Sequence, residues 1–308
     1  MKVFRDISGL KFHSNNVVTT GTFDGVHLGH KQVIDSLISS AQELKGESTI
    51  LTFFPHPRIV LQQNTKLKLL NELEEKIQLL EKTGVDNLVI VPFTKEFSQL
   101  TSSHFVRDIL VDKLETKKLI IGYDHHFGRN REGSFKHLKE FGPMYGFDVE
   151  EIPVKDVDEV NISSTKIREA LEEGKVKKAA VLLGYNYLLS GEVVKGKQIG
   201  KSLGFPTANI KVNNEYKLIP LKGVYAVLVH VNGVKYKGML NIGVRPTFDE
   251  SNSLSVEVNL FDFENDLYGQ TLKIIFVERI RDEKTFESSD DLVTQLKKDE
   301  VNCIKELQ

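Results

Sequence analysis

The segment Gly21–His30, GTFDGVHLGH, holds residue types that suit phosphate chemistry. It joins a short β-branched run, Val17–Thr20, to a run with helical apolar spacing that begins at Leu28. Glycines let a backbone approach a ligand closely, and the first turn of a helix presents unpaired N–H groups to an anion. His27 and His30 can each donate a hydrogen bond to a phosphate oxygen. The turn therefore predicts a site that steadies charge developing on a nucleotide.

The turn also admits interpretations other than a phosphate site. A glycine-rich turn between a strand and a helix is common, so simple packing stays open for the glycines alone. The H-x-G-H spacing differs from the H-E-x-x-H pattern of zinc helices, and no Gly-Lys-Ser/Thr follows as in a Walker loop. Neither a zinc site nor a Walker site is predicted here.

A second candidate is Asn161–Leu171, NISSTKIREAL. Capping of the following helix is the ordinary role of such hydroxyls, but it accounts for only one of them. Several hydroxyls and an arginine at a helix N-terminus predict a second phosphate clamp, which we expect to face Gly21–His30. The residues of this clamp are Ser163, Ser164, Thr165 and Arg168.

A third candidate, Gly196–Asn209, combines glycines and lysines, which together can hold phosphates. The residues expected to do so are Gly196, Lys201, Gly204 and Thr207. Thr207 and Asn209 point the same way on an extended segment, and their oxygens suit Mg²⁺. A surface turn followed by a strand is the alternative. Further on, Glu257 lies on the side of a strand opposite Val256 and Val258, where a solvated glutamate is the ordinary interpretation.

The first two motifs resemble one known family. GTFDGVHLGH is similar to the H-x-G-H signature of nucleotidylyltransferases, in the variant of the FMN adenylyltransferase half of bacterial bifunctional FAD synthetases, and NISSTKIR resembles that family's I-S-S-T-x-I-R motif. The resemblance implies that an FMN phosphate attacks the α-phosphate of ATP and releases pyrophosphate. It implies catalysis by His27 and His30, and ATP binding by Gly21, Phe23, Gly29, Ser163, Ser164, Thr165 and Arg168.

Two further segments, TFFPHPRIVL and IIGYDHHFGRNREG, are similar to the flavin-binding loops of the same family. The residues implied to bind flavin are Pro55, Pro57, Asp124, Phe127 and Gly128. In the second half of the chain, GFPTAN resembles the signature of riboflavin kinases, and the likeness extends through GVYAV, NIGVRPTF and VEVNLFDF. It implies transfer of the ATP γ-phosphate to the ribityl hydroxyl of riboflavin, with Glu257 as the catalytic base and Arg281 as a flavin contact.

The elements that position these motifs differ between the two halves. In the first half, strand-like and helix-like segments alternate, which predicts an α/β, Rossmann-like domain with a mostly parallel sheet and helices on both faces. The expected strands are Val17–Thr20, Ser48–Phe54, Leu88–Pro92, Lys118–Gly122 and Phe147–Ile152, and the expected helices are Leu28–Leu44, Asn71–Lys82 and Ser103–Leu114.

From about Tyr187 the segments are short and β-rich. Asn232-Gly233, between Val224–Val231 and Val234–Leu240, predicts a hairpin because these residues accept a positive φ. Strands at Ser255–Phe263 and Leu272–Ile280 and a final helix at Ser289–Leu307 complete the pattern. We expect a small barrel, which the resemblance specifies as a six-stranded antiparallel β-barrel. The predicted domains are residues 1–184, the adenylyltransferase, and 185–308, the riboflavin kinase.

Composition excludes several classes of protein. The 308 residues carry a net charge of -2, so the basic excess of nucleic-acid or acidic-membrane binding is absent. The single Cys303 allows no intrachain disulfide and fits a reducing cytoplasm. The sequence has no apolar run that predicts a signal peptide or a membrane span. The expected partners are therefore riboflavin, FMN and ATP with Mg²⁺, and an oligomer is possible but not indicated.

The leading hypothesis is a bifunctional enzyme that phosphorylates riboflavin to FMN and adenylylates FMN to FAD. One alternative is an enzyme with only one of the two activities. Another is a flavin-sensing regulatory protein, although no DNA-binding module is recognised in the sequence. A cytidylyltransferase would share the H-x-G-H motif, but it would not explain the second half of the chain.

Overall fold

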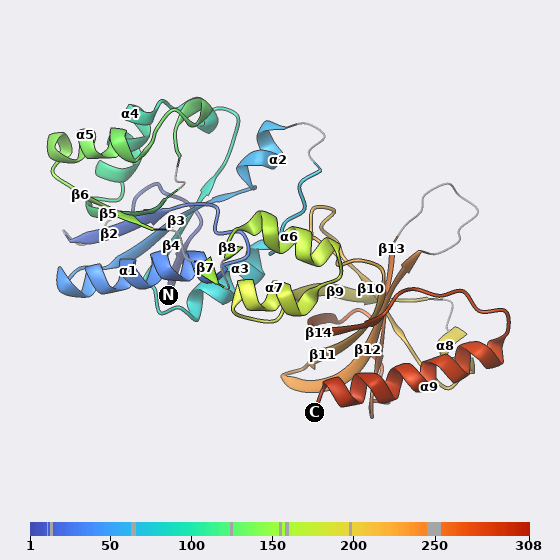
Figure 1. Cartoon of the computed structure of the whole chain (residues 1–308). Helices are drawn as coiled ribbons and strands as arrows, with labels where there is room; N and C mark the ends of the chain where they lie inside the picture. Colours follow the sequence, from blue (N-terminus) through green and yellow to red (C-terminus); the bar gives the residue numbers. More distant parts are fainter. Residues whose placement is uncertain are drawn as a thin grey trace. The chain divides into compact units, whose positions relative to one another are not determined.

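The computed structural model describes residues 1–10, 12, 15–62, 66–123, 126–153, 156–157, 160–196, 199–244 and 254–308. The chain folds into two compact units, Met1–Ser164 and Thr165–Gln308 (Figure 1). The predicted division between the catalytic domains at residue 184 stays a prediction.

The first unit is built on a six-stranded sheet whose order is β1-β4-β3-β2-β5-β6. Every neighbouring pair in this sheet is parallel, which confirms the expected parallel sheet. The strands are β1 (Lys2–Phe4), β2 (Asn16–Thr20), β3 (Ser48–Phe54), β4 (Asn87–Pro92), β5 (Thr116–Gly122) and β6 (Asp148–Ile152). A separate pair, β7 (Asp156–Val157) and β8 (Val160–Asn161), is antiparallel.

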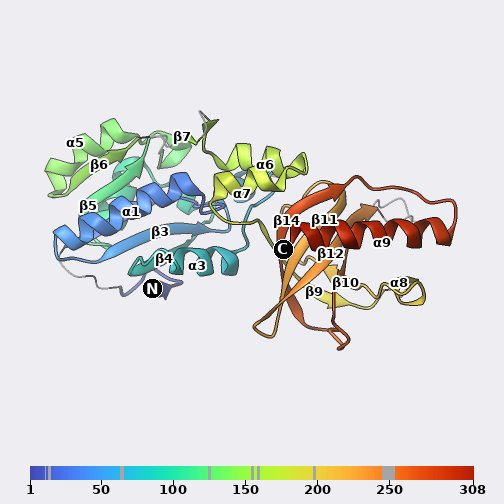
Figure 2. The same ribbon diagram turned by 60° about the horizontal axis from the view of Figure 1, so that its bottom comes forward.

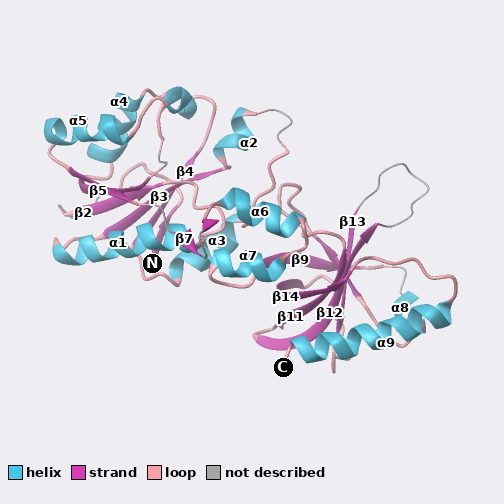
Figure 3. Ribbon diagram, in the orientation of Figure 1, coloured by secondary structure: helices cyan, strands magenta, loops and turns pink. Residues whose placement is uncertain are grey.

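Helices cover both faces of the sheet (Figures 1 and 3). Their bounds are α1 (Leu28–Glu43), α2 (Pro57–Leu61), α3 (Leu73–Glu81), α4 (Ser102–His104), the π-helical segment η2 (Phe105–Val111) and α5 (Phe135–Tyr145). Short 3-10 turns lie at η1 (Phe97–Gln99) and η3 (Arg129–Arg131). The helix expected at Ser103–Leu114 is thus α4 followed by η2, and α5 was not assigned from the sequence.

Neighbouring residues of each central strand point to opposite faces, because strand side chains alternate. Val17 of β2 packs in the cluster of Ile34 and Leu37 from α1, on one face. Val18 packs with Phe105 and the rest of η2 on the other. Both faces of the sheet are therefore buried, which is why its strands are almost continuously apolar.

The second unit is a closed six-stranded barrel in the order β10-β13-β12-β11-β14-β9 (Figure 2). All of its pairs are antiparallel, as expected. The strands are β9 (Leu188–Val194), β10 (Ala208–Lys211), β11 (Gly223–Val231), β12 (Val234–Val244), β13 (Leu254–Leu260) and β14 (Thr271–Arg281). The helices are α6 (Ser164–Glu172, whose first residue ends the first unit), α7 (Val176–Leu183), α8 (Ile199–Ser202) and α9 (Ser289–Glu306).

The hairpin predicted at Asn232-Gly233 is confirmed. β11 and β12 pair up to Val231 and Val234, and the two turn residues have φ values of 48° and 82°. Both central residues of this tight turn therefore lie in the left-handed region, which asparagine and glycine tolerate best.

The C-terminal helix α9 covers part of the outer surface of the barrel. Cys303 and Leu307 pack in one cluster with Val224, Ala226 and Met239 from β11 and β12. A buried ion pair supplements this apolar contact, because the guanidinium of Arg281 donates to both carboxylate oxygens of Asp299 at 2.6–2.9 Å. The side chain of Asp299 is only 1% exposed. Among the described residues, no helix is long and apolar enough to span a membrane.

We expect Cys303 to react with thiol reagents only after the second unit unfolds. Burial, reinforced by the nearby charges of Asp299 and Glu300, raises the pKa of the thiol to about 12. At pH 8 almost none of it is thiolate, the form that reacts. Colorimetric thiol titration of native and urea-treated protein measures this, and rapid reaction of the native chain would contradict it.

We expect Asp299→Ala to destabilise the second unit by about 3 kcal/mol, because it leaves the guanidinium of Arg281 without its buried partner. The exposed neighbour Lys298 provides the control variant Lys298→Ala. The urea dependence of Cys303 labelling measures the unfolding of this unit alone. Equal midpoints for the two variants would contradict a stabilising role for the pair.

Candidate functional sites

Three of the sequence-predicted loops leave the same edge of the parallel sheet. The central strand β2 lies between β3 and β5. The turn Gly21–His30 follows β2, Pro55 follows β3, and the loop that reaches Phe127 follows β5. β3 and β4 extend the sheet on one side of β2, whereas β5 and β6 extend it on the other. The turn thus stands at a topological switch point, where open α/β sheets bind ligands.

The backbone of this turn is held in an unusual conformation. Phe23 and Val26 have φ values of 47° and 39°, in the left-handed region that residues with a Cβ rarely occupy. A Cβ on Gly29 would lie 3.2 Å from Nδ1 of His27, which explains the glycine in the first turn of α1. Such strain persists only where the surrounding structure holds it, and it concentrates at functional sites.

The buried carboxylate of Asp24 is one of the groups that hold the turn. Asp24 is 2% exposed, and its Oδ1 accepts the N–H of Leu70 at 3.0 Å and that of Asn71 at 3.3 Å. The backbone carbonyl of Asp24 accepts a hydrogen bond from Oγ of Ser164 at 2.8 Å. The structure therefore joins Ser164 of the second predicted clamp to the first.

Lys76 of α3 is the second such group. Its ammonium donates to the carbonyl of Thr22 at 2.7 Å, and its side chain is buried. Sequence reasoning missed both Asp24 and Lys76 as site residues. The sequence does contain one signal for Asp24. An acidic residue inside a predicted anion-binding turn must be neutralised or hydrogen-bonded to another part of the chain.

The two histidines of the turn form a stacked pair. Their ring centroids are 3.6 Å apart, and the rings are inclined by 15°. His27 caps α1, with its Nδ1 accepting the N–H of His30 at 3.3 Å, so a neutral His27 carries its proton on Nε2. In the described part of the chain, Nδ1 of the half-buried His30 has no hydrogen-bond partner.

Burial, His27 and Lys76 hold the pKa of His30 well below its usual value. Burial penalises the charged imidazolium, and the two neighbours add positive charge. His30 is therefore neutral at pH 7 without a ligand. The negative charge of a bound phosphate would offset that of the two neighbours and favour protonation of His30.

The remaining clamp residues are divided between the units. Ser163 and Ser164 close the first unit, whereas Thr165 and Arg168 follow on α6 in the second. Their placement opposite the turn stays a prediction.

The predicted flavin loops have distinct structures. The Phe54–Pro55 peptide bond is cis, and Pro57 opens α2 behind the cap residue His56. The ring of Phe127 is 7% exposed and packs 5.7 Å from that of Phe105, so it belongs to the core of the unit.

Gly128, next to Phe127, has a φ of 74° and passes so close to α4 that a Cβ would lie 2.8 Å from the nitrogen of Ser102. Asp124 lies outside the described residues.

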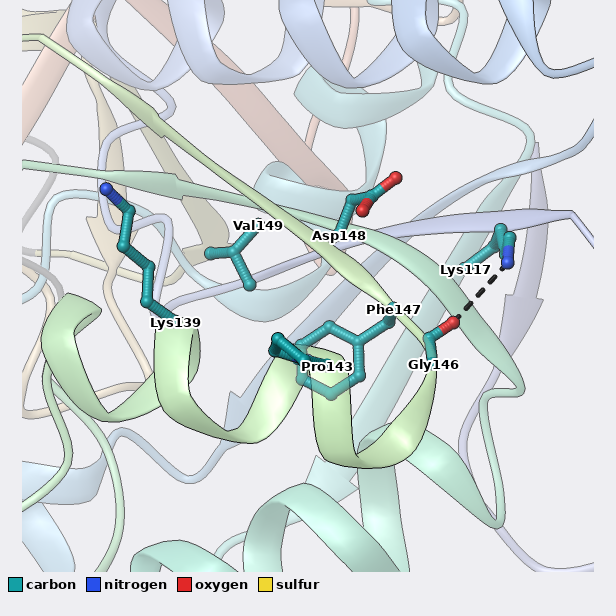
Figure 4. Close-up of a pocket in the computed structure, with 8 residues that line it drawn as sticks. Lys117, Lys139, Pro143, Gly146, Phe147, Asp148 and Val149 are labelled. Carbon is teal, nitrogen blue, oxygen red and sulfur yellow. Dashed lines mark hydrogen bonds between the residues drawn. The ribbon is translucent and has the colours of Figure 1, made fainter.

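A cavity of about 470 Å³ lies elsewhere in the first unit (Figure 4). Its lining includes Lys117, Lys139 and Asp148, and Nζ of Lys117 donates to the carbonyl of Gly146 at 3.4 Å. Lys117 and Asp148 stand at the amino ends of β5 and β6, the edge opposite the predicted loops. This cavity is therefore separate from the candidate site.

The second candidate site lies on three adjacent strands of the barrel. Glu257 of β13 pairs with Asn209 of β10 on one side and with Asn241 of β12 on the other. Directly opposed residues of antiparallel strands share a face, so the three side chains form one row. Oγ1 of Thr207 lies 3.4 Å from Oε2 of Glu257. The structure thus brings the predicted Thr207, Asn209 and Glu257 together, and it adds Asn241, which the sequence did not indicate.

The loop before β10 closes tightly around this row. A Cβ on Gly196 would lie 2.1 Å from Nδ2 of Asn209, so a larger residue there would displace the Asn209 side chain. Gly204 has a φ of 81° at the turn that leads into Pro206. Asn259 fixes the same segment, since its Nδ2 donates to the carbonyl of Pro206 at 2.7 Å. The side chain of Lys201 lies outside the described residues.

Two remaining predictions concern Arg281 and the metal. The guanidinium of Arg281 is engaged with Asp299, so its role as a flavin contact stays a prediction. The described residues contain no group of three His, Cys, Asp or Glu side chains that could hold a metal. The hydroxyl of Thr207 and the amide oxygen of Asn209 are instead hard donors, which suit Mg²⁺ together with phosphate and water.

Comparisons with known proteins cover both units. The FAD synthetase family model matches residues 10–166, and the riboflavin kinase model matches residues 183–307. A bifunctional riboflavin kinase/FMN adenylyltransferase of Listeria monocytogenes is 40% identical over 287 residues, 93% of this chain and 90% of the relative. One from Escherichia coli K12 is 37% identical over 306 residues, covering 98% and 97%.

A solved structure shares the whole fold. The crystal structure of a macrolide-efflux protein from Streptococcus pneumoniae matches with a TM-score of 0.87 and 31% identity over 97% of both chains. The term macrolide-efflux protein describes that protein only. The match shows that the two chains share a fold.

Proposed function

Because the chain belongs to the family of bifunctional riboflavin kinase/FMN adenylyltransferases, we propose that it makes FAD from riboflavin in two ATP-dependent steps, one in each predicted domain. ATP is the co-substrate of both transfers, and FMN and FAD are the products. Residues 1–184 form the adenylyltransferase and residues 185–308 the kinase in this proposal, which the limits of the two family matches support.

A cytoplasmic location fits the single, buried thiol.

In the adenylyltransferase, the turn Gly21–His30 binds the phosphates of ATP. The N–H groups at the start of α1 and the imidazoles of His27 and His30 surround the anion. His30 takes up a proton as the phosphates bind, and both rings stabilise the charge that develops while FMN attacks and pyrophosphate leaves. Ser163, Ser164, Thr165 and Arg168 complete the clamp. Pro55, Pro57, Asp124 and Gly128 shape the flavin pocket, with Phe127 supporting it from the core.

In the kinase, Glu257 accepts the proton of the ribityl hydroxyl as that oxygen attacks the γ-phosphate. Gly196, Lys201 and Gly204 hold the phosphates. Mg²⁺, held by Thr207 and Asn209 with phosphate oxygens, would neutralise phosphate charge. Arg281 contacts the flavin in this proposal.

The observation that carries this proposal is the meeting of Thr207, Asn209 and Glu257 in one unit, together with the hydrogen bond from Ser164 to the carbonyl of Asp24 in the other. The test is incubation of the purified chain with riboflavin, ATP and Mg²⁺ while flavins are separated over time. We expect FMN to appear first and FAD to follow. FAD absent at long times would refute the adenylyltransferase assignment, and FMN absent would refute the kinase assignment.

We expect substitutions in the two sites to separate the reactions. His27→Ala or His30→Ala removes one donor to the developing charge and lowers FAD formation from FMN by about 10²–10³-fold, with riboflavin phosphorylation unchanged. Glu257→Gln lowers FMN formation by about 10²–10⁴-fold and leaves adenylylation of added FMN unchanged. The exposed residues His104 and Glu264 provide the controls His104→Ala and Glu264→Gln. Loss of both activities in one variant would contradict the assignment of that residue to a single site.

We expect Asn209→Ala to raise the Mg²⁺ concentration at which FMN formation is half-maximal, because one oxygen ligand is lost. Titration of Mg²⁺ at saturating ATP measures the shift. The Mg²⁺ dependence of FAD formation in the same variant is the internal control. An unchanged Mg²⁺ dependence of FMN formation would remove Asn209 from the metal site.

A further inference from the structure

Lys76 is a buried cation that the proposed adenylyl transfer does not use. It lies on α3, it is 6% exposed, and its ammonium donates to the carbonyl of Thr22 at 2.7 Å. Lysine is almost never buried to this degree unless the charge is paired or serves a purpose. Burial lowers the pKa of Lys76, while the negative charge of Asp24 opposes that shift.

The position of Thr22 gives this contact its importance. Thr22 stands between Gly21 and Phe23, at the start of the strained turn. The acidic residue of the turn, Asp24, accepts hydrogen bonds from the N–H groups of Leu70 and Asn71, just before α3. The chain around α3 therefore holds the turn at two points, by a cation at Thr22 and by backbone donors at Asp24.

Lys76 also acts on the histidine pair. Of the described groups, His27 and Lys76 are the titratable ones that lower the pKa of His30, in addition to burial, and Asp24 is the anion that acts on Lys76. The charge of Lys76 thus acts on an imidazole that is neutral without a ligand. The same charge favours an anion at the turn, because cation and phosphate attract more strongly where water is excluded.

We propose that Lys76 is a positioning residue of the adenylyl-transfer site, whose ammonium holds the Thr22 carbonyl in place and supplies positive charge that acts on His30. This inference rests on the proposed adenylyltransferase function of the first unit. A purely structural lysine would affect folding alone. A positioning lysine affects ATP use and the titration of His30 as well.

Three variants separate the two parts of the role. Lys76→Arg keeps the charge. Lys76→Gln keeps a donor for the Thr22 carbonyl but removes the charge. Lys76→Met removes both. Lys82→Met, at the exposed C-terminal end of α3, is the matched control.

The first readout is the kinetics of FAD formation from FMN. We expect Lys76→Met to lower kcat/KM for ATP by about a hundredfold, the scale of an error of about 1 Å in positioning. We expect Lys76→Arg to recover most of the loss, while riboflavin phosphorylation by the same chain is unchanged. Wild-type kinetics in Lys76→Met would overturn the inference.

The second readout is the pKa of His30, measured by NMR titration of the imidazole carbons in the full chain without ligands. A nearby cation disfavours protonation, so its removal raises the pKa. We therefore expect the pKa of His30 to rise in Lys76→Gln and to stay near the wild-type value in Lys76→Arg and Lys82→Met. An unchanged pKa in Lys76→Gln would refute the charge role, even if FAD formation falls.

The two proposals fail in different ways. If the wild-type chain makes no FAD, the proposed function of the first unit is wrong, whereas the titration still tests the charge of Lys76. If the wild-type chain makes FAD and all three variants equal it, only the role of Lys76 is wrong. Should Lys76→Met fail to fold, as judged by circular dichroism, Lys76→Gln and Lys76→Arg decide.

Discussion

The carboxylate of Asp24 fixes the geometry on which the nucleotide turn depends. A buried carboxylate is costly unless donors surround it, and the N–H groups of Leu70 and Asn71 supply two of them. With Asp24 held in this way, Phe23 and Val26 on either side keep the left-handed backbone that leads into α1. The buried carboxylate thus fixes the backbone at the edge of the parallel sheet where we propose that the phosphates of ATP bind.

The kinase site depends on a different constraint, the register of antiparallel strands. Asn209, Glu257 and Asn241 face the same way because β10, β13 and β12 pair at those residues. A shift of a single residue would turn Glu257 to the other face and replace it with valine. The closed barrel makes such a shift difficult, since every strand is bonded on both sides. One site therefore uses strained loops, whereas the other uses regular strands.

Local patterns predicted much of this architecture. Short stretches of sequence were enough to predict the strand Ser48–Phe54, the helix after Leu28 and the turn at Asn232-Gly233. The histidine and GFPTAN motifs indicated both sites through resemblance. Contacts between distant segments were not predictable in this way. Asp24 meets Leu70, and Arg281 meets Asp299, only after the fold has formed. β1 has three residues and too little pattern, and Pro143 inside α5 concealed that helix.

The packing of α7 has a consequence for how the chain can be divided. α7 buries Val176, Ala179, Leu182 and Leu183 within the unit that contains the barrel, and Lys177 bridges Glu278 and Glu306. A fragment that starts at residue 185 would expose the apolar surface of β14 that α7 covers, which invites aggregation. A soluble fragment with the kinase activity should therefore begin before α7, upstream of the predicted domain limit at residue 184.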